Sequence, residues 1–123
     1  MSIAIVVAEF NREVTSKLEE GALAFLKEKK IKDITVVHVP GAFEIPLAAK
    51  ALLQKKKTQA VIALGAVIRG DTTHYDYVCS AVERGCTQLQ LEFVKPVVFG
   101  VLTTENEEQA FERVGGSHGH KGR

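Results

Sequence analysis

Short apolar runs alternate along the chain with segments whose apolar residues recur at helical spacing. The runs are rich in β-branched residues and are almost uninterrupted by polar positions. That pattern is typical of strands buried on both faces of a parallel sheet. Four strands are therefore predicted, at 3–7, 34–39, 60–64 with an extension to 68, and 97–102.

The segments between these runs predict helices with one apolar face each. The first helix is expected to face the core with Val14, Leu18, Ala22, Phe25 and Leu26. A second helix is expected from Pro46, which suits a first turn, and should face inward with Leu47, Ala51 and Leu52. A third, long helix is expected to turn inward Tyr75, Val78, Val82, Leu89 and Phe93, with Cys79 and Cys86 on its flank.

A fourth, short helix is expected after the last apolar run. Thr104 with Glu107 three residues later resembles a capping box, and the helix is expected to end at Val114. The glycine-rich, polar segment 115–123 is expected to form a tail.

Strands that alternate with helices predict an α/β fold whose parallel sheet is covered on both faces. Because crossover connections are right-handed, the favoured topology is a flavodoxin-like, three-layer fold with a four-stranded parallel sheet. The chain of 123 residues is expected to form a single domain, residues 1–123. In such sheets, ligands bind beyond the carboxyl ends of the strands.

Composition narrows the class of protein without identifying it. The 46% hydrophobic and 25% charged residues are ordinary for a globular protein, and the net charge of +1 argues against a nucleic-acid partner. No apolar run reaches the roughly 20 residues that span a bilayer, and residues 1–7 read as a strand and not as a signal peptide. Cys79 and Cys86 are expected to be reduced thiols in the cytoplasm, and no spacing of Cys or His indicates a metal site.

The segments after the first two strands each allow two interpretations. Phe10 is an aromatic residue at a loop tip, which either staples the following helix or stacks on a ligand. Residues 40–46 form either a rigid turn or a preorganised site, in which Phe43 offers an apolar wall and Glu44 an acceptor for hydroxyl groups.

The segment after the third strand, residues 65–74, is the most informative. Glycine and threonine residues before a long helix suit an anion such as phosphate, because the helix dipole and free N–H groups favour negative charge. His74 follows directly and could reach a ligand held there. The alternative is a capping loop with a surface histidine, and the residues alone leave both open.

Taken in order, several segments resemble the lumazine synthase family over essentially the whole chain. These segments are PGAFEIP (40–46), GAVIRGDTTHYDYVC (65–79), PVVFGVLTTEN (96–106), QAFERVGG (109–116) and Lys121-Gly122. The pair Phe10-Asn11 also fits. Any one of these motifs would be weak evidence, but the ordered set is specific.

The resemblance implies an enzyme of riboflavin biosynthesis, a transferase without a cofactor. It implies that 5-amino-6-(D-ribitylamino)uracil condenses with 3,4-dihydroxy-2-butanone 4-phosphate, giving 6,7-dimethyl-8-ribityllumazine, phosphate and water. A primary amine and a ketone react readily once they are held together, so proximity could supply most of the acceleration. This would explain why the sequence shows no elaborate catalytic cluster.

The resemblance also assigns roles to residues, with His74 as the catalytic proton shuttle. Phe10, with Asn11 beside it, is implied to stack on the pyrimidine, and Glu44 to accept from the ribityl hydroxyls. Asp71 and Thr72 are implied to border the phosphate. The remaining substrate-binding residues that it implies are Ala42, Phe43, Ala66, Val67, Ile68, Phe99, Arg113 and Lys121.

The family's assembly is implied as well: a homo-oligomer, usually a pentamer, in which Phe99 and Arg113 serve the site of the adjacent subunit. Riboflavin synthase is a candidate partner. The family usually continues past Lys121-Gly122 into a further helix, and many members begin with an extra strand, whereas this sequence ends at Arg123. We therefore expect weaker assembly, and pentamer, decamer and sixty-subunit shell stay open.

Two alternatives remain at this point. An archaeal-type riboflavin synthase would share the fold but needs no phosphate site, which the 70–73 loop and Arg113 argue against. A non-catalytic, ring-forming flavin- or lumazine-binding protein would keep the architecture without the reaction.

Overall fold

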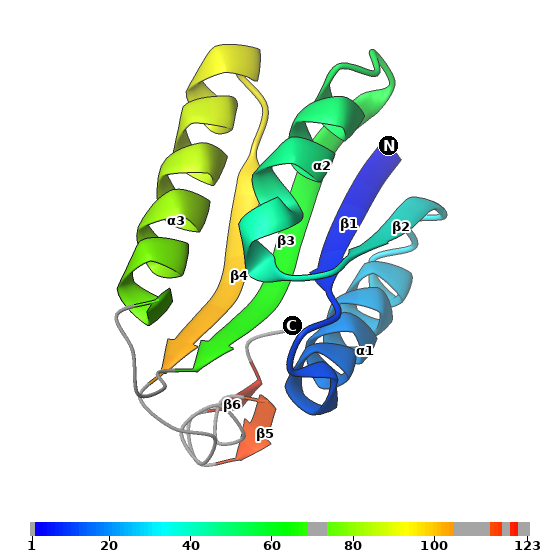
Figure 1. The fold of residues 1–123 in the computed structure, drawn as a ribbon. Coiled ribbons are helices and arrows are strands. Elements are labelled where there is room, and N and C mark those ends of the chain that lie inside the picture. The colour runs from blue at the N-terminus through cyan, green and yellow to red at the C-terminus, as the bar shows by residue number, and fades with distance from the viewer. Residues whose placement is uncertain (1, 69–73, 105–113, 117–118, 121–123) are drawn as a thin grey trace.

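The fold is built on one parallel sheet of four strands, as the alternating pattern predicts. The structure is a computed structural model that describes residues 2–68, 74–104, 114–116 and 119–120. The sheet has the order β2-β1-β3-β4, which confirms the predicted flavodoxin-like topology (Figure 1). Its strands are β1 (Ser2–Ala8), β2 (Asp33–Val39), β3 (Thr58–Ile68) and β4 (Val97–Thr104).

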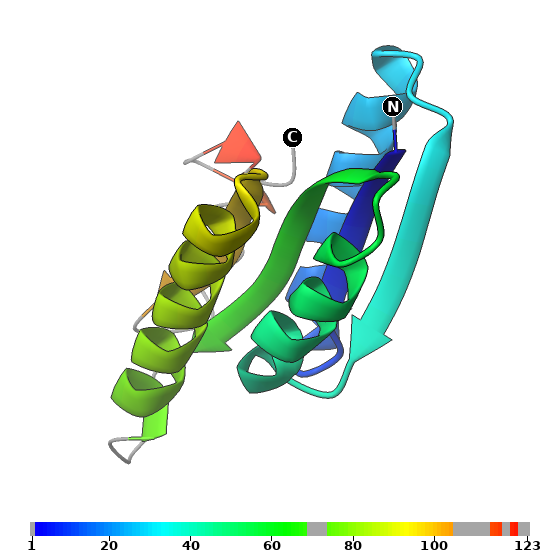
Figure 2. The same ribbon diagram turned by 90° about the horizontal axis from the view of Figure 1, so that it is seen from above.

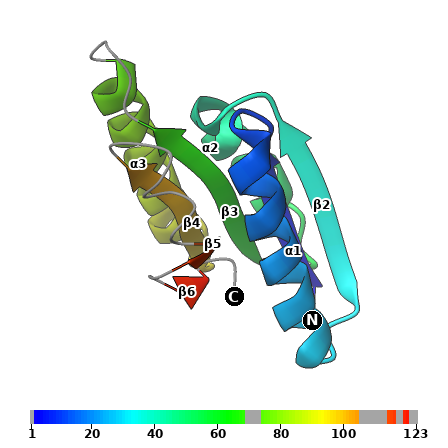
Figure 3. The same ribbon diagram turned by 90° about the horizontal axis from the view of Figure 1, so that it is seen from below.

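Helices cover both faces of this sheet and complete three layers. α1 (Arg12–Glu28) lies on one face, and the 3₁₀ turn η1 (Ala42–Glu44), α2 (Ile45–Leu53) and α3 (His74–Phe93) lie on the other (Figures 2 and 3). None of the helices in the described part of the chain has the length and apolarity to cross a membrane.

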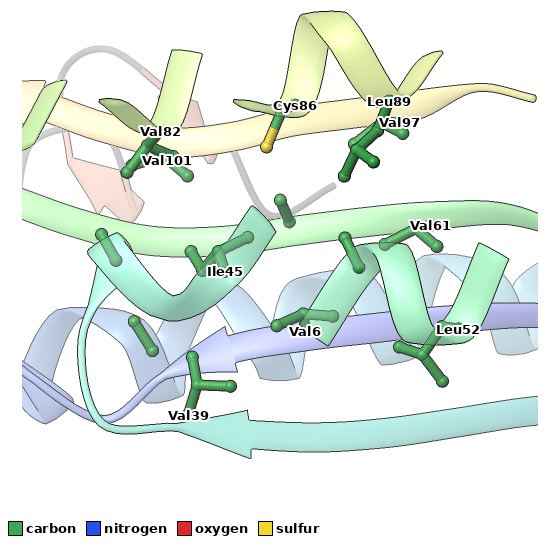
Figure 4. Close-up of a cluster of buried hydrophobic side chains, with 14 of the residues drawn as sticks. Val6, Val39, Ile45, Leu52, Val61, Val82, Cys86, Leu89, Val97 and Val101 are labelled. Carbon is green, nitrogen blue, oxygen red and sulfur yellow. The ribbon is translucent and has the colours of Figure 1, made fainter. Parts of the chain in front are cut away.

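Two hydrophobic cores follow from this layering, one on each side of the sheet. Under α1, the side chains of Val14, Leu18, Ala22 and Leu26 are buried as predicted, whereas Phe25 is only partly buried. The larger core lies between the sheet and the α2–α3 pair, where Val6, Val61 and Val82 are fully enclosed (Figure 4).

The prediction for α3 is largely confirmed, and Cys86 belongs to the core itself. Val78, Val82 and Leu89 are buried, and Tyr75, Cys79 and Phe93 pack partly against the same cluster. Cys86 is 3% exposed and points toward the sheet (Figure 4). Neither cysteine is in a disulfide.

The inward face predicted for α2 is mostly wrong. Leu47 is 77% exposed and Ala51 also faces outward, whereas Ile45, Ala49 and Leu53 are buried; only Leu52 is buried as predicted. The helix begins at Ile45, and Lys50 is its one charged residue, so the pattern of apolar residues does not specify which side faces the sheet.

The packing of α2 against α3 depends on a glycine. A Cβ atom at Gly85 would lie 2.6 Å from the Cβ and Cγ atoms of Pro46, which is much closer than packed carbon atoms approach one another. The absent side chain thus lets α3 approach the first turn of α2 at this point.

The prediction of a fourth helix is wrong at its named end, Val114, which lies in a strand. Thr104 is the buried last residue of β4, and Val114 lies in the short strand β5 (Val114–Gly116), which pairs antiparallel with β6 (Gly119–His120). A β-branched residue followed by two glycines favours extended structure over helix. Residues 105–113, where the body of the predicted helix falls, lie outside the described residues.

Candidate functional site

Three segments meet beyond the carboxyl ends of β1, β2 and β3, and hydrogen bonds join them. The backbone N–H groups of Glu9 and Phe10 donate to the carbonyl oxygens of Val39 at 2.7 Å and Pro40 at 2.9 Å. The Asn11 side chain donates from Nδ2 to the Ala66 carbonyl oxygen at 2.8 Å. The loop after β1 is therefore connected to the ends of both neighbouring strands.

The turn itself depends on an asparagine. Asn11 has φ 63° and ψ 47°, a left-handed conformation that asparagine tolerates better than most residues. It directly precedes α1, and the backbone N–H groups of Val14 and Thr15 donate to its carbonyl oxygen at 3.0 Å each. Asn11 thus connects the start of α1 to the end of β3, and a contact with substrate remains a prediction.

A pocket of about 600 Å³ opens at this edge of the sheet, a volume that suits a small molecule. It brings together seven of the predicted substrate-binding residues from three separate segments. These residues are Phe10, Ala42, Phe43, Glu44, Ala66, Val67 and Ile68.

The walls of the pocket combine exposed aromatic rings with one acidic group. Phe10 is 70% exposed and Phe43 is 62% exposed, so neither ring is committed to the hydrophobic core. Flat apolar faces of this kind bind a planar ring by stacking. Glu44 supplies carboxylate oxygens, which accept hydrogen bonds from hydroxyl groups. The pocket can therefore hold a heterocycle that carries a polyhydroxyl chain.

Pro40 and Gly41, from the segment 40–46 that was interpreted as a possible site, also line the pocket, as do two residues that the sequence interpretation did not assign to it, Tyr75 and Val78. Tyr75 and Val78 were expected to face the sheet within the apolar stripe of the long helix. Both lie in the first turns of α3, which begins at the carboxyl edge of the sheet. A signal was available, because an inward side chain so near the start of this helix must border the ligand site.

The remaining predicted site residues lie elsewhere or outside the described residues. His74 is the first residue of α3, but its side chain belongs to the part of the chain that is not described. Phe99 lies in β4, is 43% exposed, and does not line the pocket. Asp71, Thr72, Arg113 and Lys121 are outside the described residues.

No group of three or more His, Cys, Asp or Glu side chains that could hold a metal ion occurs among residues 2–68, 74–104 and the two short strands.

The chain matches known proteins over its full length. The family model described as 6,7-dimethyl-8-ribityllumazine synthase matches residues 1–123. A 6,7-dimethyl-8-ribityllumazine synthase of Bdellovibrio bacteriovorus is 55% identical over 122 residues, which are 99% of this chain and 68% of the relative. One of Coxiella burnetii strain RSA 493 is 56% identical over 122 residues, covering 98% of this chain and 81% of the relative.

Proposed function

The chain belongs to the 6,7-dimethyl-8-ribityllumazine synthase family and has the lumazine synthase activity of riboflavin biosynthesis, and from this premise we propose how its residues perform the reaction. The substrates proposed are 5-amino-6-(D-ribitylamino)uracil and 3,4-dihydroxy-2-butanone 4-phosphate. Their condensation forms a Schiff base with loss of one water, eliminates phosphate, and closes the second ring with loss of a second water. Residues 1–123 are proposed to act as one domain.

The pocket is proposed to bind the ribitylaminouracil. The observation that supports this most strongly is the convergence of Phe10, Phe43 and Glu44 on one cavity with the end of β3. Phe10 would stack on the pyrimidine, and Glu44 would accept from ribityl hydroxyls. Ala66, Val67 and Ile68 would contact the heterocycle through backbone groups, while Ala42 and Phe43 would line the ribityl chain.

The butanone phosphate is proposed to bind beside the start of α3. Asp71 and Thr72 would border the phosphate, and its charge would be favoured by the dipole of a 20-residue helix. Arg113 would supply a bidentate partner for the phosphate, and Lys121 is proposed to assist it.

His74 is proposed to transfer protons between the two bound substrates. It precedes Tyr75, which lines the pocket, and this adjacency supports the proposal. A neutral imidazole is a suitable acid and base for imine formation and phosphate elimination near neutral pH. Holding the amine beside the ketone would contribute most of the acceleration.

We predict that His74→Ala lowers kcat by about 100-fold and leaves the KM of both substrates nearly unchanged, because a lost proton shuttle affects the chemical step more than binding. The measurement is the appearance of lumazine fluorescence when both substrates are mixed with the enzyme. Phe10→Ala is the comparison, since losing a stacking wall should instead raise the KM for the ribitylaminouracil. A His74→Ala enzyme with wild-type kcat and much weaker binding would contradict the assignment.

The alternatives raised by the sequence gain no support. No observation favours an archaeal-type riboflavin synthase or a non-catalytic ring protein over the family that the chain matches.

We further propose a homo-oligomer in which adjacent subunits share each site. The position of Phe99, half-exposed on β4 and away from the pocket of its own chain, supports this arrangement. Two cysteines outside any disulfide, Cys79 and Cys86, support a reducing compartment, and we propose the cytoplasm. Riboflavin synthase, which would consume the product, is a candidate partner.

A further inference from the structure

A closed ring of four polar side chains, those of Glu9, Arg12, Glu19 and His38, lies beside the turn that carries Phe10. His38 bridges two carboxylates: its Nδ1 is 3.1 Å from Glu9 Oε1, and its Nε2 is 2.9 Å from Glu19 Oε1. Arg12 bridges the same two carboxylates, with Nη1 3.1 Å from Glu19 Oε1 and Nε 3.8 Å from Glu9 Oε2. His38 and Arg12 therefore each contact both carboxylates.

His38 is the only member of this ring that comes from β2. Glu9, Arg12 and Glu19 all belong to the loop after β1 and to α1, whereas His38 is paired with Val7 across the sheet. Its side chain is on the α1 face, because side chains alternate along a strand and Ile34 packs in the core under α1. His38 thus connects α1 and its preceding loop to β2.

This connection matters for Phe10 because few side-chain contacts hold its phenyl group in place. Phe10 is 70% exposed, so packing contributes little to its position. Two backbone hydrogen bonds, from Phe10 to Pro40 and from Glu9 to Val39, connect the turn to the end of β2. Glu9 directly precedes Phe10, and its carboxylate contacts His38 on the same strand. This side-chain contact therefore also holds the turn against β2.

We infer that His38 is a positioning residue for the ribitylaminouracil site, acting through Glu9 and Glu19 to hold the Phe10 turn against the end of β2. The inference rests on the proposed function, in which Phe10 stacks on the pyrimidine. The members of the ring are partly exposed, with side-chain exposures from 17% for Glu19 to 45% for Glu9. The effect is therefore moderate, because water weakens each pair.

Steady-state kinetics with each substrate varied in turn test this. His38→Ala is expected to raise the KM for the ribitylaminouracil about threefold, with kcat and the KM for the butanone phosphate within about twofold of wild type. His38→Arg is expected to restore the KM, because a guanidinium group can donate to both carboxylates at once. A general loss of structure would not be repaired by the larger side chain.

Two variants on α1 serve as a matched pair. Glu19→Gln weakens the ring and is expected to raise the same KM, and it should add little to His38→Ala in the double variant because both remove one interaction. Glu20→Gln removes the adjacent exposed carboxylate, which is not in the ring, and is expected to leave the KM unchanged.

The outcomes separate this inference from the proposed function. A wild-type enzyme that forms no lumazine overturns the proposed function. If Phe10→Ala leaves the KM for the ribitylaminouracil unchanged, the proposed stacking role of Phe10 is overturned, and so is the inference about His38. If Phe10→Ala raises that KM and His38→Ala does not, the inference alone is overturned. The inference is also overturned if His38→Ala lowers kcat and raises both KM values together and His38→Arg does not restore them.

Discussion

Cys86 illustrates at the scale of one residue how burial changes side-chain chemistry. It is 3% exposed and packs among Val82, Leu89 and the strands of the larger core. Burial raises the pKa of the Cys86 thiol to about 11, because a thiolate there would lose its hydration. The thiolate is the nucleophile in alkylation and disulfide exchange, so Cys86 should be inert in the folded protein at neutral pH.

The same shift predicts a loss of stability in alkali. The unfolded chain ionises Cys86 from about pH 9, but the folded chain resists until about pH 11. The unfolded state is therefore favoured progressively across this interval, by up to roughly 2 kcal/mol. Below pH 9 the folded state carries no such penalty. Urea unfolding between pH 8 and pH 11 gives the free energy of unfolding of wild type and Cys86→Ala at each pH. The slope of this free energy against pH should be more negative for wild type.

The Cys86→Ala protein will be less stable at every pH, because it loses buried sulfur, so the comparison rests on the slope and not on the absolute free energy of unfolding. Equal slopes for wild type and Cys86→Ala would refute the prediction.

At the scale of the elements, each of the two long helices is followed by a residue other than glycine that has a positive φ. Lys30, after α1, has φ 60°, and Val94, after α3, has φ 51°. At the end of α1, the N–H of Lys30 donates to the Lys27 oxygen and that of Ile31 to the Leu26 oxygen, which is the Schellman arrangement usually completed by glycine. A β-branched valine is strained there more than lysine.

We predict that Val94→Gly raises the free energy of unfolding by about 1 kcal/mol, since glycine adopts a positive φ without steric cost. The side chain of Val94 is 87% exposed, so little packing is lost. Val94→Ala is the control: it also removes the exposed apolar group but still has a Cβ, and it should gain much less. Thermal or urea unfolding compares the three proteins. A glycine variant no more stable than the alanine variant would show that the strain is not there.

The elements also differ in how far the sequence predicts them. The apolar runs of β1 and β3 have no polar face, so a central strand is their only reasonable interpretation. The helix α2 is nearly all apolar, so its inward face depends on a tertiary contact, the fit of Pro46 against Gly85. Hydrophobic periodicity contains no information about such a contact, which is why Leu47 was expected inside.

The candidate site shows the same division. Phe10, Phe43 and Glu44 could be predicted, because loops beyond the carboxyl ends of neighbouring parallel strands must meet. Tyr75 packs partly against the core, as its place in the helical stripe predicts. It also lines the pocket, because it lies in the first turn of α3, at the carboxyl edge of the sheet. The substrate contact of Asn11 stays a prediction. Its hydrogen bond to the Ala66 oxygen could not be predicted, because it depends on the distance between two strands, which a local sequence pattern does not specify.

At the scale of the whole molecule, Phe99 lies too far from the pocket to serve it within one chain. It is paired with Ala63 across β3 and β4, whereas the pocket residues of β3 begin at Ala66. Three residues of strand correspond to about 10 Å. Phe99 also lies on β4, at the edge of the sheet opposite β2. A role in binding would therefore require contact with the pocket of another subunit.

A head-to-tail contact between β4 of one subunit and the pocket of the next, repeated around an axis, would close a ring. Each site would then combine His74 of one chain with Phe99 and Arg113 of its neighbour. Complementation tests this arrangement, because a shared site can be rebuilt from two defective chains. His74→Ala and Arg113→Ala are each expected to be nearly inactive alone.

Unfolding and refolding the two variants together in equal amounts should restore about a quarter of wild-type activity, because one interface in four pairs an intact His74 with an intact Arg113 when subunits mix at random. If both residues acted within one subunit, every chain would carry one defect and mixing would restore nothing. Mass spectrometry must first show that hybrid oligomers formed. Hybrids without activity would then exclude the shared site, and the exposed ring of Phe99 would need another explanation.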